Sequence, residues 1–118
     1  TRFFKIGIAG APVTDWHLYD SIYTERYMGT PDEDPEAYER TSPIEAASDY
    51  SGRLLLIHGS QDDNVHPQNT FRLVEALIAN RMQFDLMFYP NKTHGIRGRN
   101  EVIHLWTMVF EYLERHLK

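Results

Sequence analysis

The apolar positions of the chain gather into three short runs, separated by segments with helical spacing or turn residues. The runs cover Phe3 to Ala11, Arg53 to Ile57 and Phe84 to Tyr89. The second run holds four large aliphatic residues in succession, which is typical of a strand buried on both faces in a parallel sheet. The pattern therefore predicts three strands, with the middle run as the most deeply buried.

Helical spacing and helix-end signals predict the connections between these strands. Tyr19 to Met28 fits a helix closed by Gly29, after a loop at Asp15 to His17. Ser42-Pro43-Ile44-Glu45 has the form of a capping box and predicts a short second helix. Thr30 to Pro35 is interpreted as an acidic turn region between the two helices.

Two longer helices are predicted in the second half of the chain. Pro67 to Arg81 is amphipathic, and we expect its buried face to be formed by Phe71, Val74, Leu77 and Ile78. Glu101 to Leu117 is apolar on more than one face, which exceeds the single stripe of a surface helix. We therefore expect one face of this last helix to pack on the sheet and another on a further domain or subunit.

A helix lies in each connection, so the three strands should be parallel with right-handed crossovers. The predicted fold class is α/β: the C-terminal portion of an α/β-hydrolase, with three parallel strands and flanking helices. The 118 residues suffice for one domain. The chain begins at Thr1, not at methionine, close to an apolar strand. We expect residues 1–118 to be a single partial domain cut from a larger catalytic domain.

Composition narrows the possible functions. Twelve basic residues against seventeen acidic ones give a net charge of −5, and no basic run predicts a nucleic-acid partner. No apolar run approaches the roughly 20 residues of a membrane span, so no membrane contact is predicted for this stretch. The chain has no cysteine, which excludes disulfides and thiolate metal sites within it.

Acidic residues and a histidine follow two successive strands. Asp62 and Asp63 come after the second strand, and His94 comes after the third. Chemistry in open α/β sheets lies outside the carboxyl ends of the strands, and an Asp that orients a His is the central pair of a catalytic triad. The alternatives are loop carboxylates that accept backbone N–H groups, for which Asp63 is the better candidate, and a surface histidine.

His58 and His66 are two further candidate metal ligands. His58 ends the buried strand and is interpreted as structural. A metal site from His58, Asp62 and His66 is disfavoured because their spacing matches no ligand pattern. No metal and no cofactor is predicted.

The order Asp then His is that of α/β-hydrolases, in which the nucleophile comes first. None of the five serines lies in Gly-x-Ser-x-Gly; they are Ser21, Ser42, Ser48, Ser51 and Ser60. The nucleophile elbow is expected to precede the first strand, outside this chain. The 118 residues alone are therefore predicted to be inactive.

Tyr19, Tyr23 and Tyr27 are spaced by four residues and would share one helical face. Such a stripe is usually part of a core. Three hydroxyls are costly to bury without partners, so the wall of a polar pocket is the competing interpretation.

Several blocks resemble the dipeptidyl peptidase IV branch of the prolyl oligopeptidase family of serine peptidases. They are Gly7-Ile8-Ala9, Ala11-Pro12-Val13, Trp16, Tyr19 to Gly29, Leu55 to Gly59, Asp62-Asp63-Asn64-Val65-His66 and His94-Gly95-Ile96. The resemblance covers nearly the whole chain. It implies a parent protein with a β-propeller and an α/β-hydrolase domain that releases N-terminal dipeptides with proline or alanine as second residue. It departs mildly at His17, Leu18 and Arg97, none of which carries an assigned role.

The resemblance also implies roles for residues of this chain. Asp62 is similar to the triad aspartate and His94 to the triad histidine. Tyr19 and Tyr23 resemble tyrosines of the S1 pocket, with Trp16 and Val65 also lining it, and Asn64 matches an asparagine that contacts the substrate carbonyl. The catalytic serine, an oxyanion-hole tyrosine and a glutamate pair for the substrate amine would lie outside this chain. Relatives use this end of the chain in a homodimer, so a homodimer is expected.

Two other functions remain open from the sequence. The first is a related acyl-peptide hydrolase or esterase on the same fold. The second is a non-catalytic relative that acts as a binding subunit after losing its serine, although retention of Asp62 and His94 favours an enzyme. The compartment is not indicated; in a bacterial source, the periplasm or cell envelope would be expected.

Overall fold

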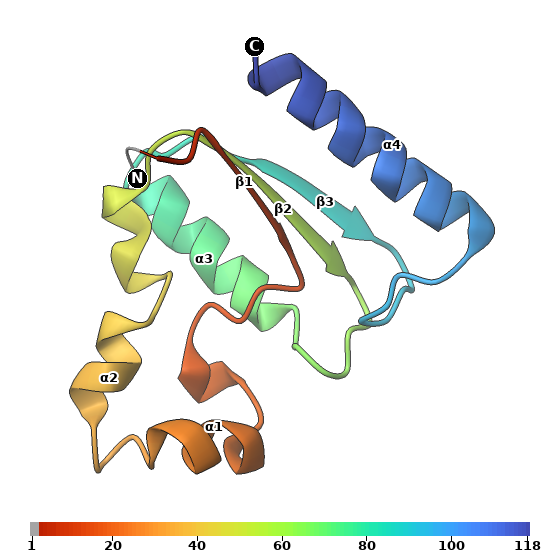
Figure 1. The fold of residues 1–118 in the computed structure, drawn as a ribbon. Coiled ribbons are helices and arrows are strands. Elements are labelled where there is room, and N and C mark those ends of the chain that lie inside the picture. The colour runs from red at the N-terminus through yellow and green to blue at the C-terminus, as the bar shows by residue number, and fades with distance from the viewer. Residues whose placement is uncertain (1–2) are drawn as a thin grey trace.

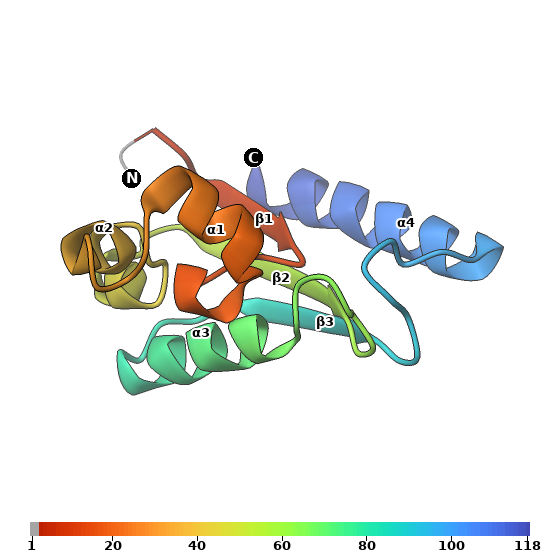
Figure 2. The ribbon, with the colours of Figure 1, turned by 90° about the horizontal axis from the view of Figure 1, so that it is seen from below.

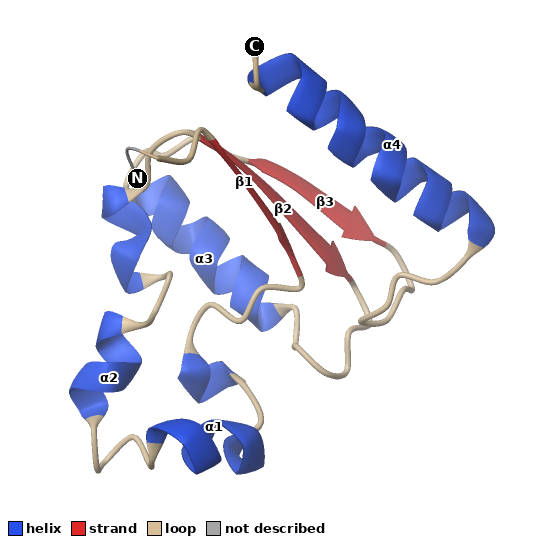
Figure 3. Ribbon diagram, viewed as in Figure 1, coloured by secondary structure: helices blue, strands red, loops and turns tan. Residues whose placement is uncertain are grey.

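One parallel sheet lies between helices on its two faces in the computed structural model, which describes residues 3–118. The strands are β1 (Ile6–Gly10), β2 (Arg53–Gly59) and β3 (Asp85–Tyr89), in that order and all parallel (Figures 1 and 3). The view from below has α3 (Gln68–Ala79) and α4 (Arg99–His116) on opposite sides of the sheet (Figure 2). The expected α/β arrangement of three parallel strands with flanking helices is confirmed.

The central strand β2 supplies side chains to both cores, which explains its unbroken apolar run. Leu55 and Ile57 join the cluster beneath α4, together with Val109. Leu56, pointing the other way, joins Leu73 of α3 in the second cluster. Because alternate residues of a strand face opposite sides, a strand covered by helices on both faces has no polar face.

β1 forms one edge of the sheet and is shorter than predicted. Phe3 and Phe4 lie before the strand and are exposed, and Ala11 lies after it. The amide of Arg53 donates to the carbonyl of Lys5 at 2.9 Å, which aligns the start of β2 with the chain leading into β1. Gly52 has φ +110°, and a Cβ there would lie 2.7 Å from the same carbonyl oxygen. Only glycine fits this close approach.

α1 (Ser21–Met28) begins two residues later than predicted. The carboxylate of Asp20 accepts from the amides of Ile22 and Tyr23, so it caps the helix. Tyr19 therefore lies before the helix, and the predicted three-tyrosine helical face is wrong at its first member. Gly29 ends the helix with φ 72°, as expected.

The segment between α1 and β2 differs from the prediction in two ways. It contains the helix α2 (Pro35–Arg40), with Asp34 as cap, where only a turn region was predicted. The predicted capping box at Ser42 is also wrong. A 3₁₀ helix, η2 (Glu45–Asp49), forms there without a side-chain cap, and the buried Ser42 hydroxyl donates to the carbonyl of Thr14 at 3.0 Å.

The predicted buried face of α3 is half wrong. Leu77 is buried, but Phe71 and Ile78 are exposed, and the inner positions are Thr70 and Leu73. The inner face thus includes polar residues close to the carboxyl end of β2. The ring of Phe71 stacks instead on Phe88 of β3, with ring centroids 5.1 Å apart.

The expectation of two apolar faces on α4 is confirmed. Val109 and Tyr112 are buried against the sheet. Ile103, Trp106 and Phe110 are more than half exposed, at 57%, 55% and 62%. Within residues 3–118, no helix combines the length and apolar character that a membrane span requires.

Candidate active site

The loops after β2 and β3 are joined at the carboxyl edge of the sheet. The amide of Ser60 donates to the carbonyl of Tyr89 at 3.0 Å, and that of Gln61 to the carbonyl of Lys92 at 2.9 Å. Gly59 makes this approach possible, since a Cβ there would lie 2.6 Å from the carbonyl oxygen of Thr93 and collide with that of Lys92. The acidic loop and the His94 loop are therefore held side by side.

Asp62 and His94 meet between these loops. Nδ1 of His94 lies 2.9 Å from Oδ2 of Asp62, although the residues are 32 positions apart in the chain. The other carboxylate oxygen, Oδ1, accepts from the amides of Asn64 and Val65, each at 2.9 Å. Asp62 is buried, so its orientation is fixed by these contacts. Asp63 is exposed, and the cap position of α3 is taken by Pro67 without a side-chain bond.

The environment of Asp62 favours its ionised form. Burial on its own would raise the pKa of the carboxyl group, but the hydrogen bond from His94 and the two backbone amides outweigh it and bring the pKa below its ordinary value. Asp62 is therefore a fixed carboxylate beside the imidazole.

The contact also defines the tautomer of His94. A carboxylate only accepts hydrogen bonds, so the neutral ring carries its hydrogen on Nδ1 and leaves the lone pair on Nε2. The side chain remains 46% exposed. Its Nε2 can therefore take a proton from a group that approaches from outside this chain.

The turn after His94 is tight and anchored. Ile96 has φ 41°, rare for a β-branched residue, and its amide donates to the carbonyl of Thr93 at 3.1 Å. The buried Ile96 side chain packs under α4. An ion pair of 2.6 Å between Lys92 and Glu101 joins the loop to the first turn of α4.

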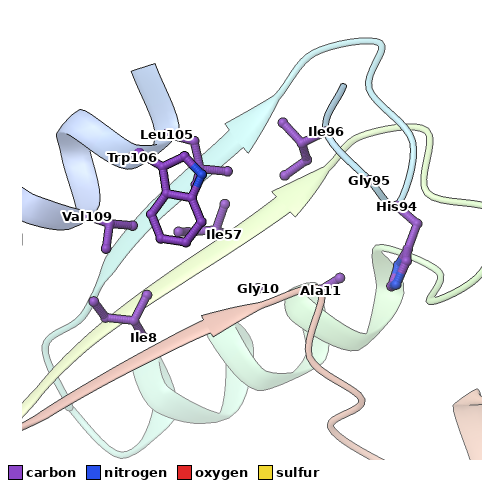
Figure 4. Close-up of a pocket in the computed structure, with 10 residues that line it drawn as sticks. All are labelled: Ile8, Gly10, Ala11, Ile57, His94, Gly95, Ile96, Leu105, Trp106 and Val109. Carbon is purple, nitrogen blue, oxygen red and sulfur yellow. The ribbon is translucent and has the colours of Figure 1, made fainter. Parts of the chain in front are cut away.

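An apolar cavity of about 450 Å³ leads from His94 along the inner face of α4. Figure 4 shows His94 at one end, beside Ala11, with Trp106 and Leu105 reaching in from α4. The sheet contributes Ile8 and Ile57. The imidazole therefore borders apolar surface on one side.

His58 lies behind Asp62 and is fully buried, in agreement with its structural interpretation. It also has a contact that the sequence did not predict: Nε2 lies 3.2 Å from Oδ2 of Asp62. Its position at the end of β2, four residues before Asp62, was the available signal.

Aromatic rings form a cluster beside the acidic loop. The ring of Tyr19 lies 6.0 Å from that of Trp16 and 5.5 Å from that of Tyr23, and Tyr23 lies 5.1 Å from Tyr27. Tyr23 and Tyr27 are 51% and 68% exposed, so within the described residues they are not core residues.

Asn64 connects this cluster to Asp62. The Tyr19 hydroxyl donates to Oδ1 of Asn64 at 2.9 Å. With its oxygen so engaged, the amide has its two N–H donors for other partners. Val65, next in the chain, is buried, so only a small part of it faces outward.

Asn69 of α3 fixes the segment that carries the aromatic rings, and the sequence analysis did not identify it. Its Oδ1 accepts from the amide of Thr14 at 3.0 Å, and its Nδ2 donates to the carbonyls of His66 and Leu18 at 3.1 and 3.4 Å. The sequence signal was only an asparagine near the start of a predicted helix, and its full burial is a finding of the structure. In residues 3–118, no group of three His, Asp or Glu side chains is arranged for a metal ion.

Comparisons with known proteins show the family of the chain. The model of the prolyl oligopeptidase family matches residues 1–118. The chain is 48% identical over 116 residues to dipeptidyl-aminopeptidase B of Aspergillus niger, covering 97% of this chain and 12% of that protein. It superimposes on the crystal structure of Porphyromonas gingivalis dipeptidyl peptidase 4 with a TM-score of 0.93 and 47% identity, covering 96% of this chain and 16% of that one.

The chain therefore belongs to the prolyl oligopeptidase family, and its sheet and helices are part of an α/β-hydrolase fold. It spans about an eighth of the length of the curated relative.

Proposed function

We propose that this chain supplies the acid and the base of a catalytic triad, and part of the S1 pocket, in a serine dipeptidyl peptidase. The observation that carries the proposal is the contact of 2.9 Å between the buried carboxylate of Asp62 and Nδ1 of His94. Family membership and the names of the relatives support a peptidase. The nucleophilic serine would come from a part of the full-length protein outside these 118 residues.

The geometry fits the two proton transfers of acyl transfer. Nε2 of His94 would accept the serine proton during attack on the scissile carbonyl and later give it to the leaving amine. Asp62 would hold the ring in the tautomer with hydrogen on Nδ1 and stabilise the imidazolium. Its three hydrogen bonds, from the amides of Asn64 and Val65 and from His94, favour its ionised form.

The aromatic cluster suits a small cyclic residue. Tyr19 and Tyr23 meet edge to face at an interplanar angle of 81°, with Trp16 beside both. A flat, apolar proline ring could stack within such a corner, and larger side chains would be excluded by shape. Asn64, oriented by Tyr19, would offer an N–H group to the substrate carbonyl. We infer proline or alanine as the preferred second residue of the substrate.

The test is the Asp62→Asn variant of the full-length protein, assayed with a Gly-Pro chromogenic amide. A neutral amide at this position favours the wrong tautomer of His94, so kcat should fall by roughly 10⁴, or about 5 kcal/mol of barrier. The matched control is Asp63→Asn, which changes the exposed neighbour and should lower kcat far less.

Equal losses at the two positions would remove the support for Asp62 as the triad acid. An N-acetylated amide substrate distinguishes the related acyl-peptide hydrolases: a dipeptidyl peptidase requires the free amine and should leave this substrate intact. Full activity of Asp62→Asn would overturn the proposal.

A further inference from the structure

His58 uses both ring nitrogens while being completely buried. Nδ1 lies 2.7 Å from Oγ1 of Thr70, and Nε2 lies 2.7 Å from the carbonyl oxygen of Val65 and 3.2 Å from Oδ2 of Asp62. The ring also stacks on Phe88, with an interplanar angle of 17°. His58 thus connects β2, the acidic loop, α3 and β3 at one point.

The partners of His58 define where its hydrogen lies. The carbonyl oxygen of Val65 is an acceptor, so Nε2 must carry the hydrogen and donate it there, while Oδ2 of Asp62 lies 3.2 Å from the same nitrogen. In the neutral ring Nδ1 is then an acceptor, and the Thr70 hydroxyl donates to it. This assignment leaves no polar atom of the imidazole without a partner.

His58 adjoins the set of donors around Asp62. Oδ1 accepts from two backbone amides, and Oδ2 faces the Nδ1 of His94 and the Nε2 of His58. Val65 takes part in this network twice: its amide donates to Oδ1 of Asp62, and its carbonyl accepts from Nε2 of His58. Rotation of the carboxylate away from His94 would break contacts on both of its oxygens.

We propose that His58 is a positioning residue of this site: its Nε2–H holds the carbonyl of Val65, whose amide holds Oδ1 of Asp62, so that Oδ2 stays aligned on Nδ1 of His94. The inference rests on the proposed function, because alignment of this pair matters for turnover only if the pair forms a triad. His58 does not touch the substrate in this role. It acts through Val65 and Asp62, and a buried histidine that only filled space would not need its donor at the Val65 carbonyl.

Two substitutions separate the donor from the packing. In His58→Gln the amide nitrogen lies three bonds from Cβ, as Nε2 does in histidine, so it can reach the carbonyl of Val65. In His58→Asn the amide lies two bonds from Cβ, as Nδ1 does, so it can reach Thr70 but not the Val65 carbonyl. Both variants place an amide in the same buried site, and both leave a smaller side chain than the ring.

The experiment uses the full-length protein and measures kcat, KM and melting temperature with a Gly-Pro chromogenic amide. His58→Asn should lower kcat about 10–100-fold, the usual effect of losing a partner that orients a functional ligand, with KM changed less than about twofold. His58→Gln should recover most of kcat, even if its melting temperature falls as far as that of His58→Asn. Asp62→Asn is assayed beside them.

A recovery of kcat by glutamine that does not follow melting temperature supports the positioning role. Equal kcat in the two variants, or losses that follow melting temperature, would overturn it. If His58→Asn does not fold, the near-isosteric Thr70→Val tests the positioning role instead. It removes the hydroxyl that donates to Nδ1 of His58 and should lower kcat severalfold at unchanged KM. An unchanged kcat would overturn the role. If Asp62→Asn is inactive and His58→Asn is fully active, only the positioning role of His58 is overturned. If Asp62→Asn is active, the proposed function is overturned.

Discussion

Trp16, Tyr19 and Tyr23 bring three aromatic rings within 6.4 Å of one another at the surface beside Asn64. Tyr23 is 51% exposed, while Trp16 and Tyr19 are half-buried. A substrate proline that stacked on one of these rings would remove apolar surface from contact with water. Burying one large apolar side chain stabilises by about 1.5–3 kcal/mol.

Replacing Tyr19 or Tyr23 by alanine in the full-length protein should therefore lower kcat/KM for a Gly-Pro amide by about 10–100-fold, since each 1.36 kcal/mol corresponds to a factor of ten. The loss should be smaller for Gly-Ala, whose side chain covers less of the pocket. The measurement is kcat/KM for both substrates beside the melting temperature of each variant.

Tyr27→Ala is the matched control, because Tyr27 is 68% exposed and contacts the cluster only at its outer end. It should change neither substrate appreciably. If the tyrosines were core residues of the complete protein, the variants would have a lower melting temperature and kcat/KM would fall equally for both substrates. That result would contradict the S1 assignment.

Single residues also show how far the sequence could predict the site. The meeting of Asp62 and His94 followed from their places after successive parallel strands, because such strand ends share one edge. The contacts of His58 and Asn69 could not be predicted in the same way. They depend on which side-chain rotamer reaches across from another element, and chain spacing carries no such information.

At the scale of elements, the site depends on the close contact between the loops after β2 and β3. Gly59 has no room for a Cβ, because the carbonyl oxygens of Lys92 and Thr93 lie directly against it. These are backbone atoms of the loop that carries His94. Relief of a clash at Gly59 would therefore move His94 relative to Asp62.

Gly59→Ala in the full-length protein should lower both stability and activity. Overpacking of this kind costs about 1–3 kcal/mol, and kcat should fall further than the small loss of folded protein explains. Kinetics and thermal unfolding of the same preparation check this. Gly7→Ala is the control: within residues 3–118 its Cβ would meet only ordinary contacts, the nearest at 3.4 Å from Leu54. Wild-type kcat in Gly59→Ala would contradict the dependence on loop contact.

The elements themselves were predictable where burial and helix length gave a strong pattern, and less so elsewhere. The three strands and the long helices α3 and α4 were found from the sequence. The six-residue α2 was missed, although Asp34 and Pro35 are a cap and a first-turn proline, because one and a half turns give no apolar period. The inner face of α3 was misassigned because Thr70 and Asn69 face inward to serve polar contacts that no hydrophobic pattern records.

At the scale of the whole molecule, two apolar surfaces remain without a partner among the described residues. β1 is an edge strand of the sheet and presents no proline or charge between Ile6 and Gly10. α4 exposes Phe110 and also Trp106, which borders the cavity beside His94; their rings lie 6.2 Å apart. Such edges and patches are typical association sites, and relatives far longer than this chain have more structure to cover them.

The 118-residue chain should consequently associate in solution and should show no turnover of a Gly-Pro amide, because it contains no Gly-x-Ser-x-Gly. Changing Trp106 and Phe110 together to polar residues separates the two surfaces. If the full-length protein is a homodimer through α4, this variant should become a monomer. If the 118-residue chain with the same changes still associates, it does so through a sheet edge, β1 or β3. Sedimentation at high micromolar concentration measures both. A sharp monomer boundary for the unmodified 118-residue chain would refute association through either the sheet edge or α4, because both apolar surfaces would then stay in contact with water at high concentration.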